Sequence, residues 1–182
     1  MTIYLIRHTQ PDVPEGICYG QTNLDIAESF AIEVDRIKAE LDNPAFTHCF
    51  SSPLQRCFKL AQALSGKKLI HTDDRLMELN FGDWEMKPWE EIRLSEEAKF
   101  WHTDFLHTPS PKGESYGQLQ ERIKSFSEGF KFIPDDSEVL IVTHSGPIRS
   151  FMTLLEGADV STVFDQIVDF GSIHKMTYHN IK

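Results

Sequence analysis

The 182-residue sequence has few cysteines, no long apolar run and no excess of basic residues. Its three cysteines, Cys18, Cys49 and Cys57, have neither close pairing nor metal-ligand spacing, which argues against a disulfide framework and a zinc site. No apolar run approaches the roughly 20 residues that a membrane-spanning helix needs. The first residues also lack a basic region followed by a long apolar segment. We therefore expect a cytoplasmic protein with reduced thiols and no membrane partner.

The chain is acidic, with 28 Asp and Glu residues against 18 Lys and Arg and a net charge of −10 at pH 7. Nucleic-acid binding needs a basic surface that displaces counterions from phosphates, so we expect no nucleic-acid partner. A phosphorylated substrate would have to be bound by a few arginines and backbone N–H groups rather than by the field of the whole molecule. The length fits a single domain, residues 1–182, and gives no indication of the oligomeric state.

Short apolar runs alternate with segments of helical periodicity along the chain. Strands are predicted at residues 3–6, 68–71 and 139–142 and within 47–53, and helices at 27–41 and 54–64, with two or three more over 88–132. This alternation predicts an α/β fold, a three-layer α/β/α sandwich around a mainly parallel central sheet. The run 166–178 predicts one or two further strands, with an antiparallel strand at the edge of the sheet.

Two of the predicted helices carry a starting signal. Ser52 is a residue type that caps helices and Pro53 is preset for the first helical position, so a helix is predicted from Leu54. Ser115 is followed three residues later by Gln118, which is the pattern of a capping box. The Ser52-Pro53 signal puts Arg56 in the first turn of a helix that follows a strand.

That arginine, Arg56, belongs to a set of polar residues that follow predicted strands. Arg7 and His8 come directly after the first strand, and His144 follows the strand at 139–142. Because the carboxyl ends of parallel strands meet at one edge of a sheet, we expect the four side chains to lie close together. Neighbouring cations lower the pKa of a histidine, and a neutral imidazole is a nucleophile.

The same residue types suit a phosphoryl group. Guanidinium groups bind phosphate oxygens with two N–H donors at once. Ser145 and Gly146 would open the helix after the last buried strand, and the free N–H groups of a helix N-terminus attract anions. The sequence therefore predicts an anion site at the carboxyl edge of the sheet, with a phosphorylated small molecule as the partner.

Four segments, in their order and spacing, carry a resemblance to a known family. LIRHT, SSPLQR, RLMELNFGDWEM and VTHSG resemble the motifs of the histidine phosphatase superfamily, also called phosphoglycerate-mutase-like, over nearly the whole chain. Within that superfamily, FGDWEM and its flanks look most like the α-ribazole phosphatases of cobalamin biosynthesis. The resemblance implies a metal-independent phosphomonoesterase that needs no cofactor.

The resemblance also implies a role for each matching residue. His8 would be the nucleophile that accepts the phosphoryl group, while Arg7, Arg56 and His144 would hold its oxygens. Glu78 would protonate the leaving oxygen and then deprotonate the water that attacks phosphohistidine. Further N–H donors to the phosphate would come from the start of the following helix.

The loop after His8 departs from the family pattern. Thr9 stands where the family has glycine, and Pro11 and Pro14 stand at its threonine and asparagine positions. These changes put an amide contact to the phosphate in doubt. The loop residues that could supply a replacement contact are Thr9, Gln10, Tyr19, Gly20 and Gln21.

Other chemistries stay open at the level of sequence. A cysteine phosphatase would use Cys49 and Arg56, but six residues separate them, one more than the motif of those enzymes has, and Pro53 removes an N–H from the loop. A non-catalytic member would bind phosphorylated ligands or proteins, yet binding alone needs no general acid such as Glu78. A mutase is less expected because the region between Arg56 and Ser115 is short.

The covering loops would determine which phosphate ester is bound. The resemblance suggests α-ribazole 5′-phosphate, whose flat base could stack on one of the aromatic residues of these loops, Tyr19, Trp84, Trp89 or Trp101. A broad-specificity phosphatase of small molecules and a phosphohistidine-protein phosphatase are the alternatives. Which tryptophans contact the substrate is not specified by the sequence.

Overall fold

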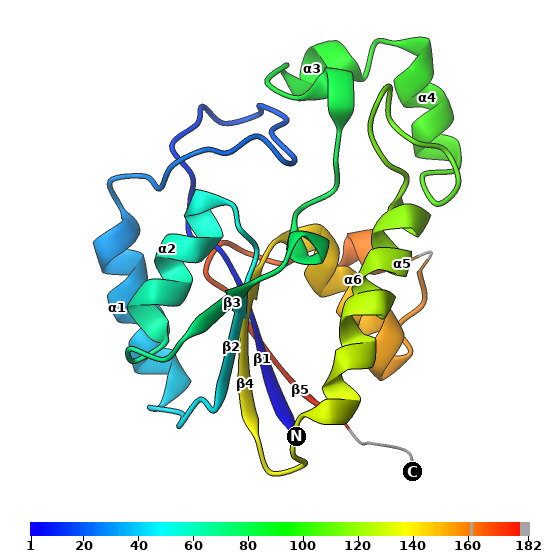
Figure 1. Cartoon of the computed structure of the whole chain (residues 1–182). Coiled ribbons are helices and arrows are strands. Elements are labelled where there is room, and N and C mark those ends of the chain that lie inside the picture. Colours follow the sequence, from blue (N-terminus) through cyan, green and yellow to red (C-terminus); the bar gives the residue numbers. More distant parts are fainter. Residues whose placement is uncertain (161, 179–182) are drawn as a thin grey trace.

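Five strands form one sheet in the order β3-β2-β4-β1-β5 (Figure 1). The strands are β1 (Thr2–Arg7), β2 (His48–Ser51), β3 (Ile70–Thr72), β4 (Glu138–Thr143) and β5 (Ile173–Thr177). The structure is a computed structural model that describes residues 1–160 and 162–178. Neighbouring strands are parallel except β5, which pairs antiparallel with β1 at the edge of the sheet. The predicted, mainly parallel sheet with an antiparallel edge strand is confirmed.

Helices cover both faces of this sheet and one of its edges. They are α1 (Phe30–Leu41), α2 (Gln55–Leu64), α3 (Trp89–Ile92), α4 (Glu96–Thr103), α5 (Tyr116–Ser127) and α6 (Ser145–Glu156), with short 3₁₀ turns η1 (Asp74–Leu76), η2 (Gly82–Trp84), η3 (Glu128–Phe132) and η4 (Val163–Asp165). In Figure 1, α1 and α2 lie on one side of the sheet and α5 and α6 on the other, while α3 and α4 stand above its carboxyl edge. The predicted three-layer α/β/α architecture is confirmed.

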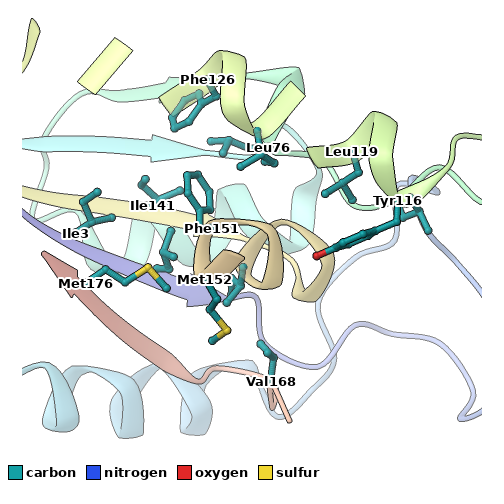
Figure 2. Packing of buried hydrophobic residues seen from close by; sticks show 14 of the residues in the cluster. Ile3, Leu76, Tyr116, Leu119, Phe126, Ile141, Phe151, Met152, Val168 and Met176 are labelled. Atoms are coloured by element: carbon teal, nitrogen blue, oxygen red, sulfur yellow. The ribbon is translucent and has the colours of Figure 1, made fainter. Parts of the chain in front are cut away.

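The two central strands, β1 and β4, explain how the layers hold together. Residues along each strand alternate between the two faces, and those of both strands are almost wholly apolar. On one face Ile3, Leu5 and Ile141 pack under α5 and α6 (Figure 2). On the other face Ile6 and Val142 pack under α1 and α2. Burial on both faces fixes the register between β1 and β4. A slip of one residue would move the side chains of each face of a strand to the opposite face of the sheet.

Two predicted helix starts are displaced in the structure. The predicted 27–41 helix begins at Phe30, because Ser29 Oγ donates a hydrogen bond to Glu33 instead of capping the chain. The predicted 54–64 helix begins at Gln55, and Pro53 is not in it. The Ser52 hydroxyl accepts a bond from the Leu54 N–H but lies outside the helix. The prediction of a Ser-Pro helix start is therefore wrong in detail.

The segment that covers the carboxyl edge contains two of the predicted helices, α3 and α4, ahead of α5. The capping box at the start of α5 is confirmed, since the Ser115 side chain accepts from the Gln118 N–H and the Gln118 side chain accepts from the Ser115 N–H. The third strand is shifted to Ile70–Thr72, where it pairs with β2. None of the helices in the described residues is long and apolar enough to span a membrane.

The core at the sheet centre should dominate stability. Ile141 is fully buried between the layers, so Ile141→Ala should lower the free energy of unfolding by about 2–5 kcal/mol in urea denaturation. Ile32, on the outer face of α1, is 77% exposed and provides the matched control: Ile32→Ala should change it by about 0.5 kcal/mol or less. Equal losses for the two variants would contradict the assignment of the core.

Candidate active site

The parallel pairing of β1 and β4 brings two histidines together. Arg7 pairs with Thr143 in the strand register, so His8 and His144 are the first residues beyond the two strand ends. The His8 N–H continues the ladder by donating to the Thr143 carbonyl at 3.0 Å. The two imidazole rings lie 5.0 Å apart, edge to face, and both side chains are buried. The structure thus puts the two predicted histidines in one site.

The hydrogen bonds of His8 define which ring nitrogen is free. Nδ1 lies 2.6 Å from the Thr9 carbonyl oxygen, which can only accept, so Nδ1 carries the proton. Nε2 is then unprotonated and accepts a bond from Arg56 Nε at 3.3 Å. Its lone pair therefore faces the Arg56 guanidinium group. This is the tautomer that a nucleophilic Nε2 requires.

Arg56 lies in the first turn of α2 and is completely buried. Its guanidinium donates to the carbonyl oxygens of Thr22 at 2.8 Å and Gly20 at 2.7 Å, and it lies 3.3 Å from His144 Nδ1. Gly20 therefore acts through its backbone. Among the ion pairs of residues 1–160 and 162–178, none involves Arg56 or Arg7. Neither guanidinium group is therefore in direct contact with a carboxylate within the described residues.

Arg7 is fixed at the opposite side of His8. Its Nη1 donates to the Val168 carbonyl at 2.6 Å, and its Cζ lies 3.9 Å from the centre of the Phe170 ring. Its Nε has no hydrogen-bond partner. The Phe170 ring also packs 5.5 Å from the ring of His8. The guanidinium is thus oriented by the 168–170 segment and keeps a donor available.

Burial and positive charge keep both histidines neutral. Burial lowers the pKa of His8 well below its usual value, the charges of Arg56 and Arg7 lower it further, and the bond to Thr9 opposes them in part. The pKa of His144 is also well below its usual value, first through burial and then through Arg56. Neutral imidazoles are the forms that can accept a phosphoryl group or hold its oxygens.

His144 is packed against two small polar side chains. Its Nε2 lies 2.9 Å from Ser52 Oγ and 3.3 Å from Cys57 Sγ. Burial raises the pKa of the Cys57 thiol to about 12, so the sulfur is neutral. Ser52 was expected to cap α2, and the structure instead shows its hydroxyl against the histidine.

Glu78 approaches the site from the loop after η1. Its Oε1 accepts bonds from the N–H groups of Gly146 at 3.0 Å and Leu79 at 2.9 Å, and its Oε2 accepts from Ser145 Oγ at 3.1 Å. The Gly146 N–H, which was expected to be free at the start of α6, is therefore occupied by the Glu78 carboxyl group. A Cβ at Gly146 would collide with the carboxylate oxygen.

A cavity of about 350 Å³ opens beside these groups. Its lining is largely aromatic and basic, and its residues include Arg7, Tyr19, Glu78, Phe81, Trp89, Arg93, Trp101, Tyr116, Ser145, Arg149 and Phe164. In the part of the chain that the structure describes, no group of three or more His, Cys, Asp or Glu side chains could hold a metal ion. Arg7, Glu78 and Ser145 form a polar part of its wall, and aromatic residues of the 81–101 segment form another part. His8, Arg56 and His144 are not among the lining residues.

The remaining residues that were predicted to contact the phosphate do not all lie at the cavity. Tyr19 lines the cavity, with its ring centre 5.1 Å from Arg56 Cζ. Gln21 lies behind the site, where its side chain donates to the Glu78 carbonyl at 3.0 Å. Gln10 is exposed and its N–H donates to Glu33. Neither glutamine side chain faces the cavity.

The three tryptophans differ in whether they line the cavity, and the position of Cys49 bears on the cysteine-phosphatase alternative. Trp89 and Trp101 line the cavity, whereas Trp84 is buried in the core and does not. Thr9 is buried and its hydroxyl has no partner. Cys49 lies in the core between the sheet and α2, where burial raises its pKa, so the geometry does not support a cysteine nucleophile.

Several cavity residues were not singled out from the sequence. Arg149 is one helical turn after Ser145 on α6, and this spacing could have placed it on the same face. Tyr116 follows the capping serine of α5, and its buried hydroxyl has no hydrogen-bond partner. Phe164 comes from η4, a segment with no motif to mark it. Arg149 interacts electrostatically with Glu78 and Arg7, so it lies on the charged side of the cavity.

Comparison with known proteins identifies the family. The model described as Histidine phosphatase superfamily (branch 1) matches residues 3–182, so the chain belongs to that superfamily. It is a phosphoric monoester hydrolase, as its phosphatase relatives indicate. "Putative phosphoserine phosphatase 2" of Hydrogenobacter thermophilus is 28% identical over 177 residues, which are 94% of this chain and 86% of that protein.

Two further relatives carry another name. The adenosylcobalamin/alpha-ribazole phosphatase of Escherichia coli K12 is 24% identical over 94% of this chain and 87% of its own. The structure of the alpha-ribazole phosphatase from Shigella flexneri superposes with a TM-score of 0.90 at 22% identity, over 99% of this chain and 92% of that one. At such identity the likeness of the structures shows the fold, and the substrate is a separate question.

The lowered histidine pKa values predict how stability depends on pH. In the unfolded chain His8 and His144 would titrate near about 6.5, whereas in the folded protein they stay neutral to lower pH. Below about pH 6.5 the unfolded state binds more protons, so the free energy of unfolding should fall as the pH decreases towards the folded values. Above about pH 6.5 this contribution is fully present.

Urea unfolding at about pH 7.5 and about pH 5.5 measures this effect. His144→Asn removes one of the two groups, so its stability should fall less between the two pH values than that of the unchanged protein. NMR spectra showing both imidazoles charged in the folded protein near pH 6 would contradict the assignment.

Proposed function

We propose that this protein hydrolyses phosphate esters of small organic molecules by transferring the phosphoryl group to Nε2 of His8. The observation that carries the proposal is the state of that ring. Nδ1 is bound to the Thr9 carbonyl, Nε2 holds the lone pair, and burial with two nearby guanidinium groups keeps the pKa low. The histidine is therefore a neutral, oriented nucleophile, next in the chain to Arg7, which lines the cavity.

The phosphate would be held by the two guanidinium groups near His8. Arg7 and Arg56 would donate to the phosphate oxygens, and neutral His144 would donate its one ring N–H at a third side. Charge on these oxygens is largest as the phosphoryl group passes between donor and acceptor, so fixed guanidinium groups stabilise that state most. Carbonyl bonds to Arg56 hold it in place before substrate arrives.

The reaction would take two steps that use Glu78 twice. In the first, the bond from His8 Nε2 to phosphorus forms, the bond from phosphorus to the ester oxygen breaks, and that oxygen takes a proton from Glu78. In the second, the Glu78 carboxylate takes a proton from water, the water oxygen bonds to phosphorus, and the phosphorus–nitrogen bond breaks. Inorganic phosphate and the alcohol are the products.

The aromatic end of the cavity supports α-ribazole 5′-phosphate as the substrate. This ester carries a flat benzimidazole, and Trp89, Phe81 and Trp101 form a cluster with ring centres 5.2 Å and 6.2 Å from that of Phe81. The volume of about 350 Å³ is in the range of small-molecule sites. Relatives named as alpha-ribazole phosphatases favour the same choice.

A phosphorylated amino acid is the second candidate. Arg149 and the unpartnered hydroxyl of Tyr116 lie at the same cavity and could bind a carboxylate. The relatives named as phosphoserine phosphatases favour this candidate. A broad-specificity small-molecule phosphatase, a phosphohistidine-protein phosphatase and a mutase would each be recognised in the assays below.

The first prediction concerns the intermediate. Rapid quenching with a ³²P-labelled ester should trap label on the protein that is stable to base and labile to acid, and mapping should assign it to His8. His8→Ala should abolish trapping and turnover. Activity should be unchanged by a chelator, since the arginines supply the charge that a metal supplies elsewhere.

The control for trapping is Cys49→Ser, which should leave the labelling intact. Label at Cys49 instead of His8, or loss of turnover in the chelator with recovery on adding Mg²⁺ or Zn²⁺, would overturn the proposed mechanism. Stoichiometric binding of phosphate esters without any release of phosphate would indicate a non-catalytic member.

A second prediction concerns the substrate. kcat/KM should be higher for α-ribazole 5′-phosphate than for phosphoserine, nucleoside monophosphates, sugar phosphates, 3-phosphoglycerate or a phosphohistidine peptide. Stacking of a base on an aromatic side chain is worth about 1–3 kcal/mol, so Trp89→Ala should raise KM for α-ribazole 5′-phosphate roughly 5- to 150-fold.

Arg149→Met is the matched variant at the other wall of the cavity. It should lower kcat/KM for phosphoserine much more than for α-ribazole 5′-phosphate, which has no carboxylate. If phosphoserine is the better substrate of the unchanged enzyme, the second candidate replaces the first. Similar rates on every ester would instead indicate broad specificity, and the phosphatase assignment would stand.

A further inference from the structure

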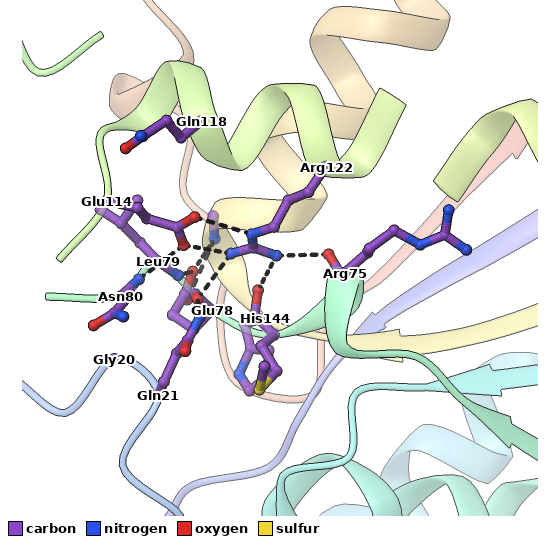
Figure 3. A network of polar contacts seen from close by, with 12 residues as sticks. Gly20, Gln21, Arg75, Glu78, Leu79, Asn80, Glu114, Gln118, Arg122 and His144 are labelled. Atoms are coloured by element: carbon purple, nitrogen blue, oxygen red, sulfur yellow. Dashed lines mark hydrogen bonds and ion pairs between the residues drawn. The ribbon is translucent and has the colours of Figure 1, made fainter. Parts of the chain in front are cut away.

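A partly buried arginine on α5, outside the cavity, binds the backbone that carries Glu78 (Figure 3). Arg122 Nη1 donates to the carbonyl oxygens of Arg75 and Met77, both at 2.6 Å, and its Nη2 donates to the carbonyl of Glu78 at 2.9 Å. One guanidinium thus satisfies three carbonyls of a four-residue stretch. This stretch leaves η1 and has no sheet partner for these groups.

Glu114 holds the guanidinium from its other edge. Its two carboxylate oxygens accept from Arg122 Nη2 at 2.7 Å and Nε at 3.1 Å, and Oε1 also accepts the Asn80 N–H at 2.9 Å. The side chains of the pair are only 17% and 16% exposed. The two hydrogen bonds between Glu114 and Arg122 orient the guanidinium plane. The contact between Glu114 and the Asn80 N–H also fixes the backbone that follows Glu78.

Glu78 is therefore held at two points that differ in kind. Its carboxylate is bound by the Gly146 N–H and the Ser145 hydroxyl at the start of α6. Its backbone carbonyl is bound by Arg122 and by the Gln21 side chain, and Arg122 alone of these two also binds the carbonyls of Arg75 and Met77. A carboxyl group that gives its proton to an ester oxygen has to leave or rotate within the first contact, and the backbone contacts then fix where the side chain starts from.

We infer that Arg122, oriented by Glu114, is a positioning residue that sets the distance between the Glu78 carboxyl group and the leaving oxygen of the substrate. This inference rests on the proposed role of Glu78. Arg122 does not line the cavity, and its hydrogen bonds go to backbone carbonyls of residues 75–78 and to Glu114 rather than to His8 or His144. Its charge also contributes to the lowered pKa of His144, and a lysine at this position would keep that charge.

The dependence on leaving group tests this inference. An aryl phosphate releases a phenolate that needs little protonation, whereas an alkyl phosphate releases an alkoxide that needs the acid. Glu78→Gln should therefore slow alkyl esters far more than p-nitrophenyl phosphate. Arg122→Lys and Glu114→Gln should shift the ratio of the two rates in the same direction, by roughly 10- to 100-fold, a part of what a general acid contributes.

The Arg122→Lys variant distinguishes an effect of the hydrogen-bond geometry of Arg122 from an effect of its charge. Lysine keeps the positive charge near the site but is a point donor that cannot bond Glu114 and three carbonyls together. A ratio equal to that of the unchanged enzyme in Arg122→Lys would overturn the inference. The ratio does not depend on the concentration of folded enzyme, so partial unfolding of a variant leaves the readout valid.

Arg75→Met is the matched control from the same stretch. The Arg75 side chain bonds Asp73 and the Ser125 carbonyl, pointing away from Glu78, so it also ties the stretch to α5. Its loss should lower the melting temperature without changing the ratio. A shift as large as that of Arg122→Lys would mean that any loosening suffices, which contradicts a specific role for Arg122.

Failure of the positioning inference and failure of the proposed role of Glu78 give different results. If Glu78→Gln shifts the ratio and the Arg122 and Glu114 variants do not, the positioning inference is wrong and the proposed acid stands. If Glu78→Gln itself slows both esters equally, the acid assignment fails, and the inference that depends on it fails too, while trapping of phosphate on His8 is still decided separately.

Discussion

The site depends on a buried guanidinium group, Arg56, that forms no ion pair within the described part of the chain. Arg56 is bonded only to carbonyls and imidazole nitrogens, and burying a charge without pairing it destabilises the fold. Burial, and after it the charge of Arg56, keeps His8 and His144 neutral. A dianionic phosphate bound as proposed would supply the missing counterion. Binding of phosphate would then stabilise the fold as well as the transferred group.

The fold was predictable because its signals are local. Two apolar runs of strand length, each ending in a histidine, implied parallel neighbours with His8 and His144 at one edge, and the register of β1 and β4 confirms that fold. Glu78 came only from resemblance, since nothing in an acidic loop marks one carboxylate among several. Arg122 could not have been found, because its contacts lie 44 to 47 positions away and depend on how α5 packs. Ser52 matched a capping rule, but contact with His144 changed its role.

Different parts of the chain form the end of the cavity that faces the phosphate and the end that faces the rest of the substrate. The end that faces the phosphate is built from strand ends and helix starts, whose positions follow from the packing of the sheet. The other end comes from α3, α4 and η4, which meet through aromatic contacts such as Phe105 with Phe164 at 4.6 Å. Aromatic clusters tolerate substitution more readily than a strand register does. Variation in this family is therefore expected to change the alcohol recognised and leave the phosphoryl chemistry intact.

The contact between Glu78 and the start of α6 has a consequence for turnover. In this structure the Gly146 N–H donates to the Glu78 carboxyl group and is not open to a phosphate oxygen. Because a helix N-terminus attracts anions, a phosphate oxygen would compete with Glu78 for the same N–H. The start of α6 would therefore bind the phosphate only after the Glu78 carboxyl group has moved, and movement of the proposed acid would be coupled to occupation of the phosphate site.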